Sequence, residues 1–217
     1  MSPSTVSFIE YELQAIALIW MGVIYTIKAV QLSKLPMPWE RGEKSGSPQM
    51  GVLKSYGSIF MPWSMESSRK HRFRWLGFIL YHIGALVAIV NTFTLPFAPS
   101  FMTENVKLIF AILIAPSVVI GLIKIIQRLI QPELRYISTF DDYFSLLSLE
   151  FFLFFGVMTL LTGAPVWSIS YFLITAFFLF YVPFSKISHY IYFFFAHVLT
   201  GWRYGYRGIN PQKTTQS

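Results

Sequence analysis

Residues 107–126 read KLIFAILIAPSVVIGLIKII, and Lys107 and Lys124 are the only charged residues in this stretch. An α-helix of about 20 residues extends roughly 30 Å, which matches the hydrocarbon core of a membrane. A helix that is apolar on all sides does not suit the surface of a soluble domain. The stretch therefore predicts a helix that crosses a membrane.

Four further stretches are long and apolar enough to cross a membrane: residues 8–30, 75–95, 145–162 and 166 to at least 184. The first opens with Glu10 and Glu12 and has no basic segment before it, so we expect a true span rather than a signal peptide. The last stays largely apolar to about residue 199, on the order of 50 Å of helix. It must tilt, kink at Pro183 or project from the membrane. The sequence predicts an all-α integral membrane protein with five transmembrane helices.

The composition agrees with this fold class. Of the 217 residues, 54% are hydrophobic, 18% are aromatic and 12% are charged, whereas about a quarter of a soluble domain is charged. The chain has no cysteine, which excludes disulfides, thiolate-bound iron–sulfur clusters and covalent haem attachment. Any redox cofactor must therefore be held by histidine, methionine or carboxylate side chains.

The net charge of +7 comes from basic residues that lie in alternate connections. The first-to-second connection, the third-to-fourth connection and the C-terminal segment contain Lys34, Arg41, Lys44, Lys54, Arg69, Lys70, Arg72, Arg74, Arg128, Arg135, Lys186, Arg203, Arg207 and Lys213. On the other side Lys107 stands alone. Because cytoplasmic connections carry the excess of Lys and Arg, we expect the N-terminus outside and the C-terminus in the cytoplasm. The charge indicates a multi-pass protein of the cell inner membrane and not a nucleic-acid-binding protein.

The chain is predicted to be organised as one membrane domain over residues 1–209. Within its basic segment 31–74, residues 50–68 (MGVLKSYGSIFMPWSMESS) are too polar to span, and we expect them to lie along the cytoplasmic membrane surface. Residues 210–217 have the composition of a disordered tail.

Histidine occurs four times, as His71, His82, His189 and His197. His71 and His82 are eleven residues apart, which on a helix gives nearly the same face at about 16 Å axial separation. His189 and His197 are eight apart, about 80° and about 12 Å from each other. The second and fifth spans run antiparallel, so His82 is level with His189, and His71 with His197. Because neutral imidazole is a common axial ligand of haem iron, two stacked bis-histidine pairs are one interpretation.

Other interpretations stay open for each histidine. A histidine within a membrane also forms hydrogen bonds between helices without binding a metal, which is the alternative for His82 and His189. His71 lies in the basic run RKHRFR, where a solvated or headgroup-bound side chain is the alternative. The same alternative extends to its predicted partner, His197.

Two phrases resemble a known family. Residues 80–86 read LYHIGAL and residues 183–189 read PFSKISH. They resemble the second and fifth helices of the gamma subunit of respiratory nitrate reductase, a five-helix membrane cytochrome b with an outer N-terminus. Asp142 before an apolar run and Thr162-Gly163 after the fourth helix fit the same pattern. The resemblance covers about residues 75–206, and it implies that His82 and His189 ligate one haem b.

The chain departs from this family at the outer haem. The family has a second histidine about ten residues after the first, with a partner about eighteen residues before the ligand that corresponds to His189. Here the two regions read VNTF (90–93) and Tyr171. The departure resembles the related b cytochromes of membrane complexes in sulfate reducers and hydrogenases, which pair with a heterodisulfide-reductase-like iron–sulfur protein. One haem b is expected, and a second haem at His71 and His197 stays open.

Three basic residues, Lys186, Arg203 and Arg207, are expected on the side of the haem propionates, although the positive-inside pattern alone also accounts for them. Glu150 is the only acid well inside a predicted span. It either relays a quinol proton or bonds to a neighbouring helix.

Lys107 ends the phrase ENVK, residues 104–107. This phrase resembles the start of the third helix of the nitrate reductase gamma subunit, where a lysine contributes to quinol oxidation. The resemblance implies that Lys107 helps to bind a quinone on the outer side. The alternative is a lysine that snorkels to the membrane surface.

These features predict an electron-transfer subunit of a quinol:acceptor oxidoreductase complex rather than a complete enzyme. The chain would carry electrons between a membrane quinone pool, or a periplasmic cytochrome c, and a cytoplasmic iron–sulfur subunit of heterodisulfide-reductase-like or nitrate-reductase-beta-like type. Further membrane subunits are compatible with this role. A haem-free helical anchor for a soluble enzyme is the main alternative, and a small transporter is disfavoured because no inverted repeat is evident.

Overall fold

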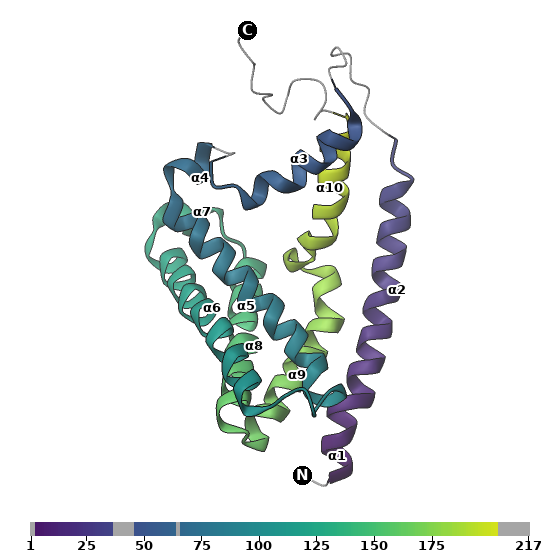
Figure 1. The fold of residues 1–217 in the computed structure, drawn as a ribbon, viewed down its shortest axis with the longest axis vertical. Coiled ribbons are helices and arrows are strands. Elements are labelled where there is room, and N and C mark those ends of the chain that lie inside the picture. The colour runs from purple at the N-terminus through teal and green to yellow at the C-terminus, as the bar shows by residue number, and fades with distance from the viewer. Residues whose placement is uncertain (1–2, 37–45, 64–65, 204–217) are drawn as a thin grey trace. The chain divides into compact units, whose positions relative to one another are not determined.

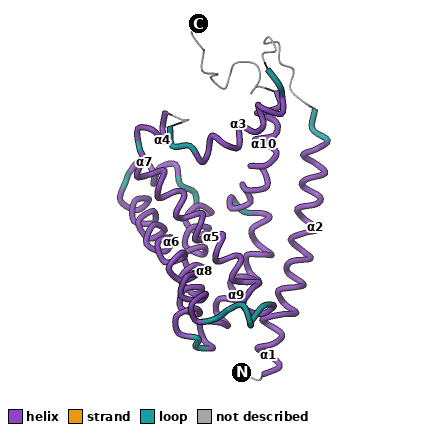
Figure 2. Tube along the Cα trace, in the orientation of Figure 1, coloured by secondary structure: helices purple, strands orange, loops and turns teal. Residues whose placement is uncertain are grey.

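The computed structural model describes residues 3–36, 46–63 and 66–203 (Figure 1). Within these ranges the regular structure is entirely helical, as Figure 2 shows. Five helical segments are long and apolar enough to cross a membrane: Pro3–Ser33, Arg72–Phe97, Glu104–Ile130, Phe140–Thr162 and Pro165–Phe184. This confirms the predicted all-α fold and the five candidate spans, whereas their direction across a membrane stays a prediction.

The elements follow one another along the chain with short connections. They are α1 (Pro3–Ser7), the π-helix η1 (Phe8–Glu12), α2 (Leu13–Ser33), α3 (Pro48–Phe60), α4 (Glu66–Lys70), α5 (Arg72–Phe97), α6 (Glu104–Ile130), α7 (Pro132–Ile137), α8 (Phe140–Thr162), α9 (Pro165–Tyr181), the 3₁₀ turns η2 (Val182–Phe184) and η3 (Lys186–Ser188), and α10 (His189–Arg203). The five helical segments of membrane length begin and end within about five residues of the predicted stretches.

Local capping chemistry determines both ends of α8. Thr139 and Asp142 form a capping box, in which the backbone N–H of Thr139 donates to Asp142 Oδ2 at 2.8 Å. At the other end Gly163 has φ 61°, a left-handed conformation that glycine adopts without steric penalty. The predicted helix end at Thr162-Gly163 is confirmed.

The chain divides into two compact units. The first unit contains Met1–Ile24 and Leu76–Ile187, and the second contains Tyr25–Trp75 and Ser188–Ser217. Both lie largely within the stretch predicted as one domain, and the predicted tail, residues 210–217, lies outside the described residues.

In the first unit α6 packs against α8, and α8 packs against α9 (Figure 1). Helix α5 approaches α6 where two small residues face each other: a Cβ added to Gly84 would lie 1.8 Å from Ser117 Oγ. Ser117 Oγ donates a hydrogen bond to Leu80 O at 3.0 Å. Small residues allow membrane helices to approach closely, and a hydroxyl between them adds an interhelical hydrogen bond.

The fifth apolar stretch is interrupted at Pro183, one of the three outcomes that its length predicts. Helix α9 ends at Tyr181, and Pro183 lies in the 3₁₀ turn η2. Ser185 is extended (φ −95°, ψ 172°), and a regular α-helix resumes at His189. Proline has no N–H to donate and its ring crowds the preceding turn, which favours an interruption of the helix at this point.

In the second unit α3 packs along α10. A Cβ added to Gly201 would lie 2.3 Å from Val52 Cα, so the two backbones are in contact there. Tyr56 on α3 contacts the ring of Phe193 on α10 at 5.9 Å between centroids. The segment predicted to lie along the membrane surface therefore begins as a helix packed on α10, and its place at a membrane surface stays a prediction.

Candidate functional site

His82 lies on α5, on a face of the helix that is exposed in this chain. Its Nδ1 is 2.7 Å from Phe78 O, and its ring lies 4.1 Å from the Phe78 ring. A carbonyl oxygen can only accept a hydrogen bond, so Nδ1 carries the hydrogen and Nε2 carries the lone pair. A histidine that binds a metal through one ring nitrogen characteristically donates from the other in this way.

His189 is the first residue of α10, directly after the break at Pro183, and its side chain is exposed in this chain. Because the break precedes it, the orientation of His189 is not a continuation of the α9 helical repeat. His82 belongs to the first unit and His189 to the second, so their predicted pairing on one haem stays a prediction.

His197 lies two turns further along α10, within the contact between α10 and α3. Its Nδ1 is 2.8 Å from Ser55 Oγ, and its ring is flanked by Tyr56 at 5.2 Å and Phe193 at 4.4 Å. His71 is an exposed residue between α4 and α5, and its carbonyl accepts the hydrogen bond that starts α5, from Trp75 N at 3.1 Å. The structure records no contact between His71 and His197, and their predicted haem stays a prediction.

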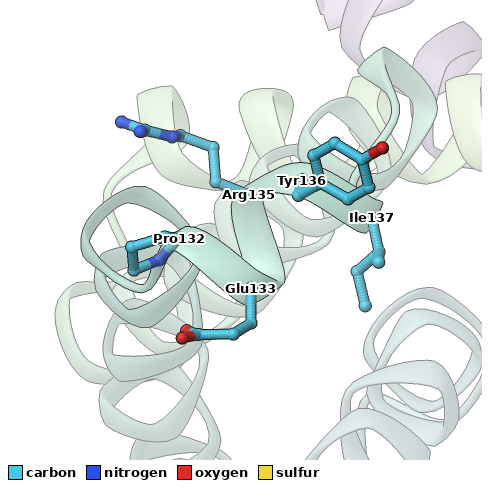
Figure 3. A pocket seen from close by; sticks show the side chains of 5 residues that line it. All are labelled: Pro132, Glu133, Arg135, Tyr136 and Ile137. Carbon is cyan, nitrogen blue, oxygen red and sulfur yellow. The ribbon is translucent and has the colours of Figure 1, made fainter.

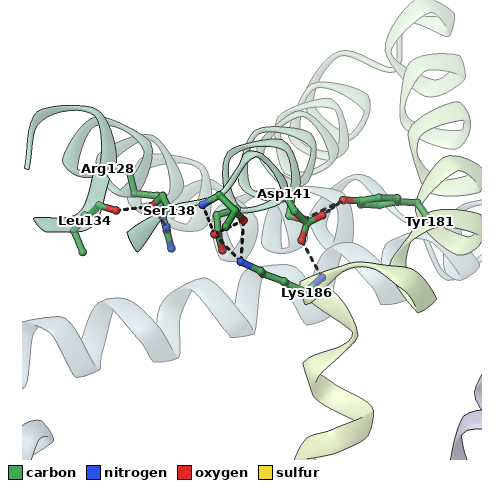
Figure 4. Close-up of polar contacts among 9 residues, drawn as sticks. Arg128, Leu134, Ser138, Asp141, Tyr181 and Lys186 are labelled. Atoms are coloured by element: carbon green, nitrogen blue, oxygen red, sulfur yellow. Dashed lines mark hydrogen bonds and ion pairs between the residues drawn. The ribbon is translucent and has the colours of Figure 1, made fainter. Parts of the chain in front are cut away.

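Lys186 belongs to a network that we call the polar clamp, formed by Thr139, Asp141, Asp142, Tyr181 and Lys186. Asp141 accepts from Tyr181 Oη at 2.5 Å and from Lys186 N at 3.3 Å. Lys186 Nζ donates to Asp142 Oδ2 at 2.7 Å and to Thr139 Oγ1 at 2.9 Å. Figure 4 shows Asp141 between Tyr181 and Lys186. The clamp joins the start of α8 to the break before His189.

A second set of polar contacts supports the turn that leads into the clamp. Arg128 Nη1 donates to Ser138 Oγ at 2.6 Å, and Ser138 Oγ donates to Leu134 O at 2.6 Å (Figure 4). Tyr143 Oη donates to Arg128 O at 3.2 Å. The connection between α6 and α8 is therefore held by side chains of both helices.

The other predicted cationic residues have separate environments. Lys107 lies in the first turn of α6, where its Nζ is 2.8 Å from Glu104 Oε1. Arg203 is the last residue of α10 and is half-buried. Arg207 lies outside the described residues. The predicted roles of these residues toward a quinone or haem propionates stay predictions.

Glu150 lies in the middle of α8 and is only 5% exposed. Neither of its carboxylate oxygens has a hydrogen-bond partner among the residues that the structure describes. The sequence left two roles open for Glu150, a proton relay and a hydrogen bond to a neighbouring helix. Within the described part of the chain the structure contains no such hydrogen bond.

The region of α5 around Asn91 and Tyr171 of α9 are joined by hydrogen bonds. Tyr171 Oη donates to Ala88 O at 2.5 Å and lies 2.9 Å from Thr92 Oγ1. Asn91 Nδ2 lies 3.4 Å from the same Tyr171 Oη. Tyr171, Asn91 and Thr92 are all buried, so α5 and α9 meet directly at this level.

A shallow cavity of about 720 Å³ lies on α7, lined by Pro132, Glu133, Arg135, Tyr136 and Ile137. Its lining residues are exposed and come from a single helix of six residues, and Figure 3 shows their side chains pointing outward in different directions. None of the predicted site residues contributes to it. It has no features of a cofactor site.

Sequence reasoning did not identify Asp141, Tyr181, Ser55 or Tyr81 as partners of the candidate residues. The adjacent Asp141 and Asp142 at the start of an apolar helix were a usable signal, because acids so close to a span need a cation or a helix N-terminus. For Ser55 and Tyr81 no sequence signal existed, since serine and tyrosine are common in such segments.

Comparison of the chain with protein-family models, with curated proteins and with solved structures finds no match. Among the described residues no group of three or more His, Asp or Glu side chains is arranged to hold a metal ion. Haem differs from such a site because its iron needs only one or two axial side chains from the protein.

Proposed function

We propose that this chain is the haem b subunit of a respiratory redox complex in the cell inner membrane. It passes electrons between a membrane quinone, or an outer cytochrome partner, and a cytoplasmic iron–sulfur subunit. The absence of cysteine makes the iron–sulfur clusters the property of a partner chain. A bound haem supplies one-electron oxidation and reduction, and the chain supplies ligands, burial and charge.

The observation that carries this proposal is the geometry of His82. It lies on the second membrane-length helix, and its Nδ1 hydrogen bond to Phe78 O at 2.7 Å directs the lone pair of Nε2 away from its own helix backbone. Nε2, the second ring nitrogen of an imidazole held in this way, is the atom that would bind a haem iron.

The residues of the chain fit one haem better than the two haems of the nitrate reductase gamma subunit. His82 and His189 are the residues that would bind the haem iron. The contact of Tyr171 with Thr92 and Ala88 occupies the level at which that family holds its outer haem. His197 is engaged with Ser55 and two aromatic rings, so a second haem would have to displace these contacts.

The test is haem quantitation per chain together with a reduced-minus-oxidised visible spectrum of the purified protein. We expect about one haem b per chain, and loss of nearly all haem in His82→Ala and His189→Ala. Ile83→Ala, at an exposed neighbouring position of the same helix, is the matched control and should keep its haem. A colourless wild-type protein would favour the haem-free anchor, and full haem in both histidine variants would refute the ligand assignment.

A further inference from the structure

Glu150 meets α5 and α6 at a point where α6 has no side chain. Its Oε2 lies 1.8 Å from the position that a Cβ on Gly121 would occupy, and Tyr81 Cε2 lies 3.2 Å from the same position. The carboxyl group of α8 and the phenol ring of α5 therefore meet over Gly121 of α6. Any larger residue at 121 would close this space.

The polar atoms at this point are buried and unsatisfied. Glu150 Oε1, Glu150 Oε2 and the Tyr81 hydroxyl have no hydrogen-bond partner among the residues that the structure describes. Leaving a buried polar atom unpaired is costly, and more so when it is charged. A carboxyl group without a partner in such surroundings is a site at which gain or loss of a proton has a large energetic effect.

Glu150 and Tyr81 form a small cluster, and the charged group that faces it comes from α6. Lys124 Nζ lies 4.3 Å from the centre of the Tyr81 ring, one turn beyond Gly121. Arg128, a further turn along, is directed to Ser138 instead. Tyr81 is the titratable group that α5 contributes. Glu150 and Tyr81 are buried in membrane-length helices, so a change in nearby charge acts on Glu150 with little screening by water.

This cluster lies beside the proposed haem ligand. The rings of Tyr81 and His82 are 6.1 Å apart, and Tyr81 also meets Glu150 over Gly121. In a medium of low dielectric constant an added electron and a carboxylate repel each other, and the repulsion is weakly screened.

We propose that Glu150 is a redox-linked proton site, which takes up one proton when the haem held by His82 is reduced and releases it when the haem is oxidised. The inference rests on the proposed function. One electron comes from the quinol or iron–sulfur donor, one proton comes from the solvent, and an O–H bond forms on the Glu150 carboxylate. Reoxidation breaks that bond and returns the proton.

The test is a redox titration of the haem between pH 6 and pH 8 in wild-type protein, Glu150→Gln and Glu133→Gln. For one proton per electron, each tenfold change in proton concentration shifts the midpoint potential by about 59 mV. We expect this slope in wild type and in the control Glu133→Gln, whose carboxyl group is exposed on α7. Glu150→Gln should keep its haem and lose most of the slope.

A second measurement does not depend on a substituted protein. Dicyclohexylcarbodiimide adds to protonated carboxyl groups in apolar surroundings, and the adduct is located by mass spectrometry of peptides. We expect faster modification of Glu150 in the reduced than in the oxidised wild-type protein. Failure of the proposed function would appear as a wild type without haem. Equal slopes in wild type and Glu150→Gln, or equal modification in both redox states, would overturn the proton site alone.

Discussion

The segments that lead to His82 and His189 are stabilised by different kinds of contact. Helix α5, which carries His82, runs without interruption and meets its neighbours through small residues and buried hydroxyls, at Gly84 with Ser117 and at Ala88 with Tyr171. His189 follows an interruption of the helix, and the polar clamp binds the interrupted segment at Lys186 to the start of α8.

The difference shows two ways to orient a side chain at a membrane helix. On α5 the orientation of His82 follows from helical periodicity, because each residue turns by about 100° from the one before. The helical periodicity of α9 ends at Pro183 and therefore does not fix the direction of His189. The interrupted segment before His189 is instead bound by the hydrogen bonds of the polar clamp at Lys186. The two regions should therefore respond to different substitutions.

The largest effect is expected where two backbones touch in the second unit. In Gly201→Ala the new Cβ would lie 2.3 Å from Val52 Cα and 2.7 Å from Gly51 O, and backbone atoms cannot rotate away. We expect a loss of stability of about 1–3 kcal/mol from this overpacking, seen as a lower midpoint of thermal unfolding in detergent. The control Gly57→Ala, which meets nothing within 4 Å on α3, should be neutral or slightly stabilising. Equal midpoints in the two variants would show that α3 and α10 do not pack here.

A smaller effect is expected from Gly84→Ala on α5. Its Cβ would meet the side chain of Ser117, with Oγ at 1.8 Å and Cβ at 2.8 Å, and would lie 3.1 Å from Leu113 O. The hydroxyl can rotate away, which breaks its hydrogen bond to Leu80 O, worth about 0.5–1.5 kcal/mol. Ser117 Cβ can only move with α6, so a small shift of the helix adds to this loss. Gly77→Ala, with nothing within 4 Å on the same helix, is the control. If Gly84→Ala unfolds at a lower temperature than Gly201→Ala, the expectation that a clash with a backbone costs more stability than a clash with a side chain is wrong.

The smallest effect is expected from the ion pair of the polar clamp. Lys186 is 55% exposed and its partner Asp142 is 17% exposed, so solvent screens part of the attraction and Lys186→Met should cost about 1 kcal/mol or less. The pair of Lys70 with Glu66, at 66% and 67% exposure, is a matched control. Lys70→Met should cost about 0.3–0.5 kcal/mol. The two variants are compared by thermal unfolding at low and high salt, and a Lys186→Met effect no larger than the control would show that the clamp does not stabilise the break.

Much of the fold was predictable because it depends on local composition. Five apolar runs predict five membrane-length helices, and the length of the last run predicts three outcomes, of which a kink at Pro183 is one. Thr162-Gly163 predicts the end of α8, since glycine supplies the left-handed conformation that a helix end requires. Each of these signals lies within a few residues of the structure that it determines.

The partners of the candidate residues were not predictable in the same way. A helix that is apolar all round has no polar face to mark which side packs inward, so the sequence left open whether Glu150 bonds to a neighbour. The same uncertainty applied to His197, whose partner Ser55 is 142 residues away in the chain. Lys186 was expected near haem propionates, and its pairing with Asp142 depends on the close approach of two distant segments.

The amino-acid sequence by itself determined the number of membrane-length helices and the four positions at which histidine occurs. The reason is that a membrane-length helix requires a long apolar run, and such a run consists of consecutive residues. Only the tertiary structure decided that the fifth apolar stretch is interrupted at Pro183, that Tyr171 contacts Thr92, and that Lys186 pairs with Asp142. It also decided that Glu150 is buried over Gly121 with no hydrogen-bond partner among the described residues. These outcomes depend on which helix faces meet, and packing between distant segments sets that choice.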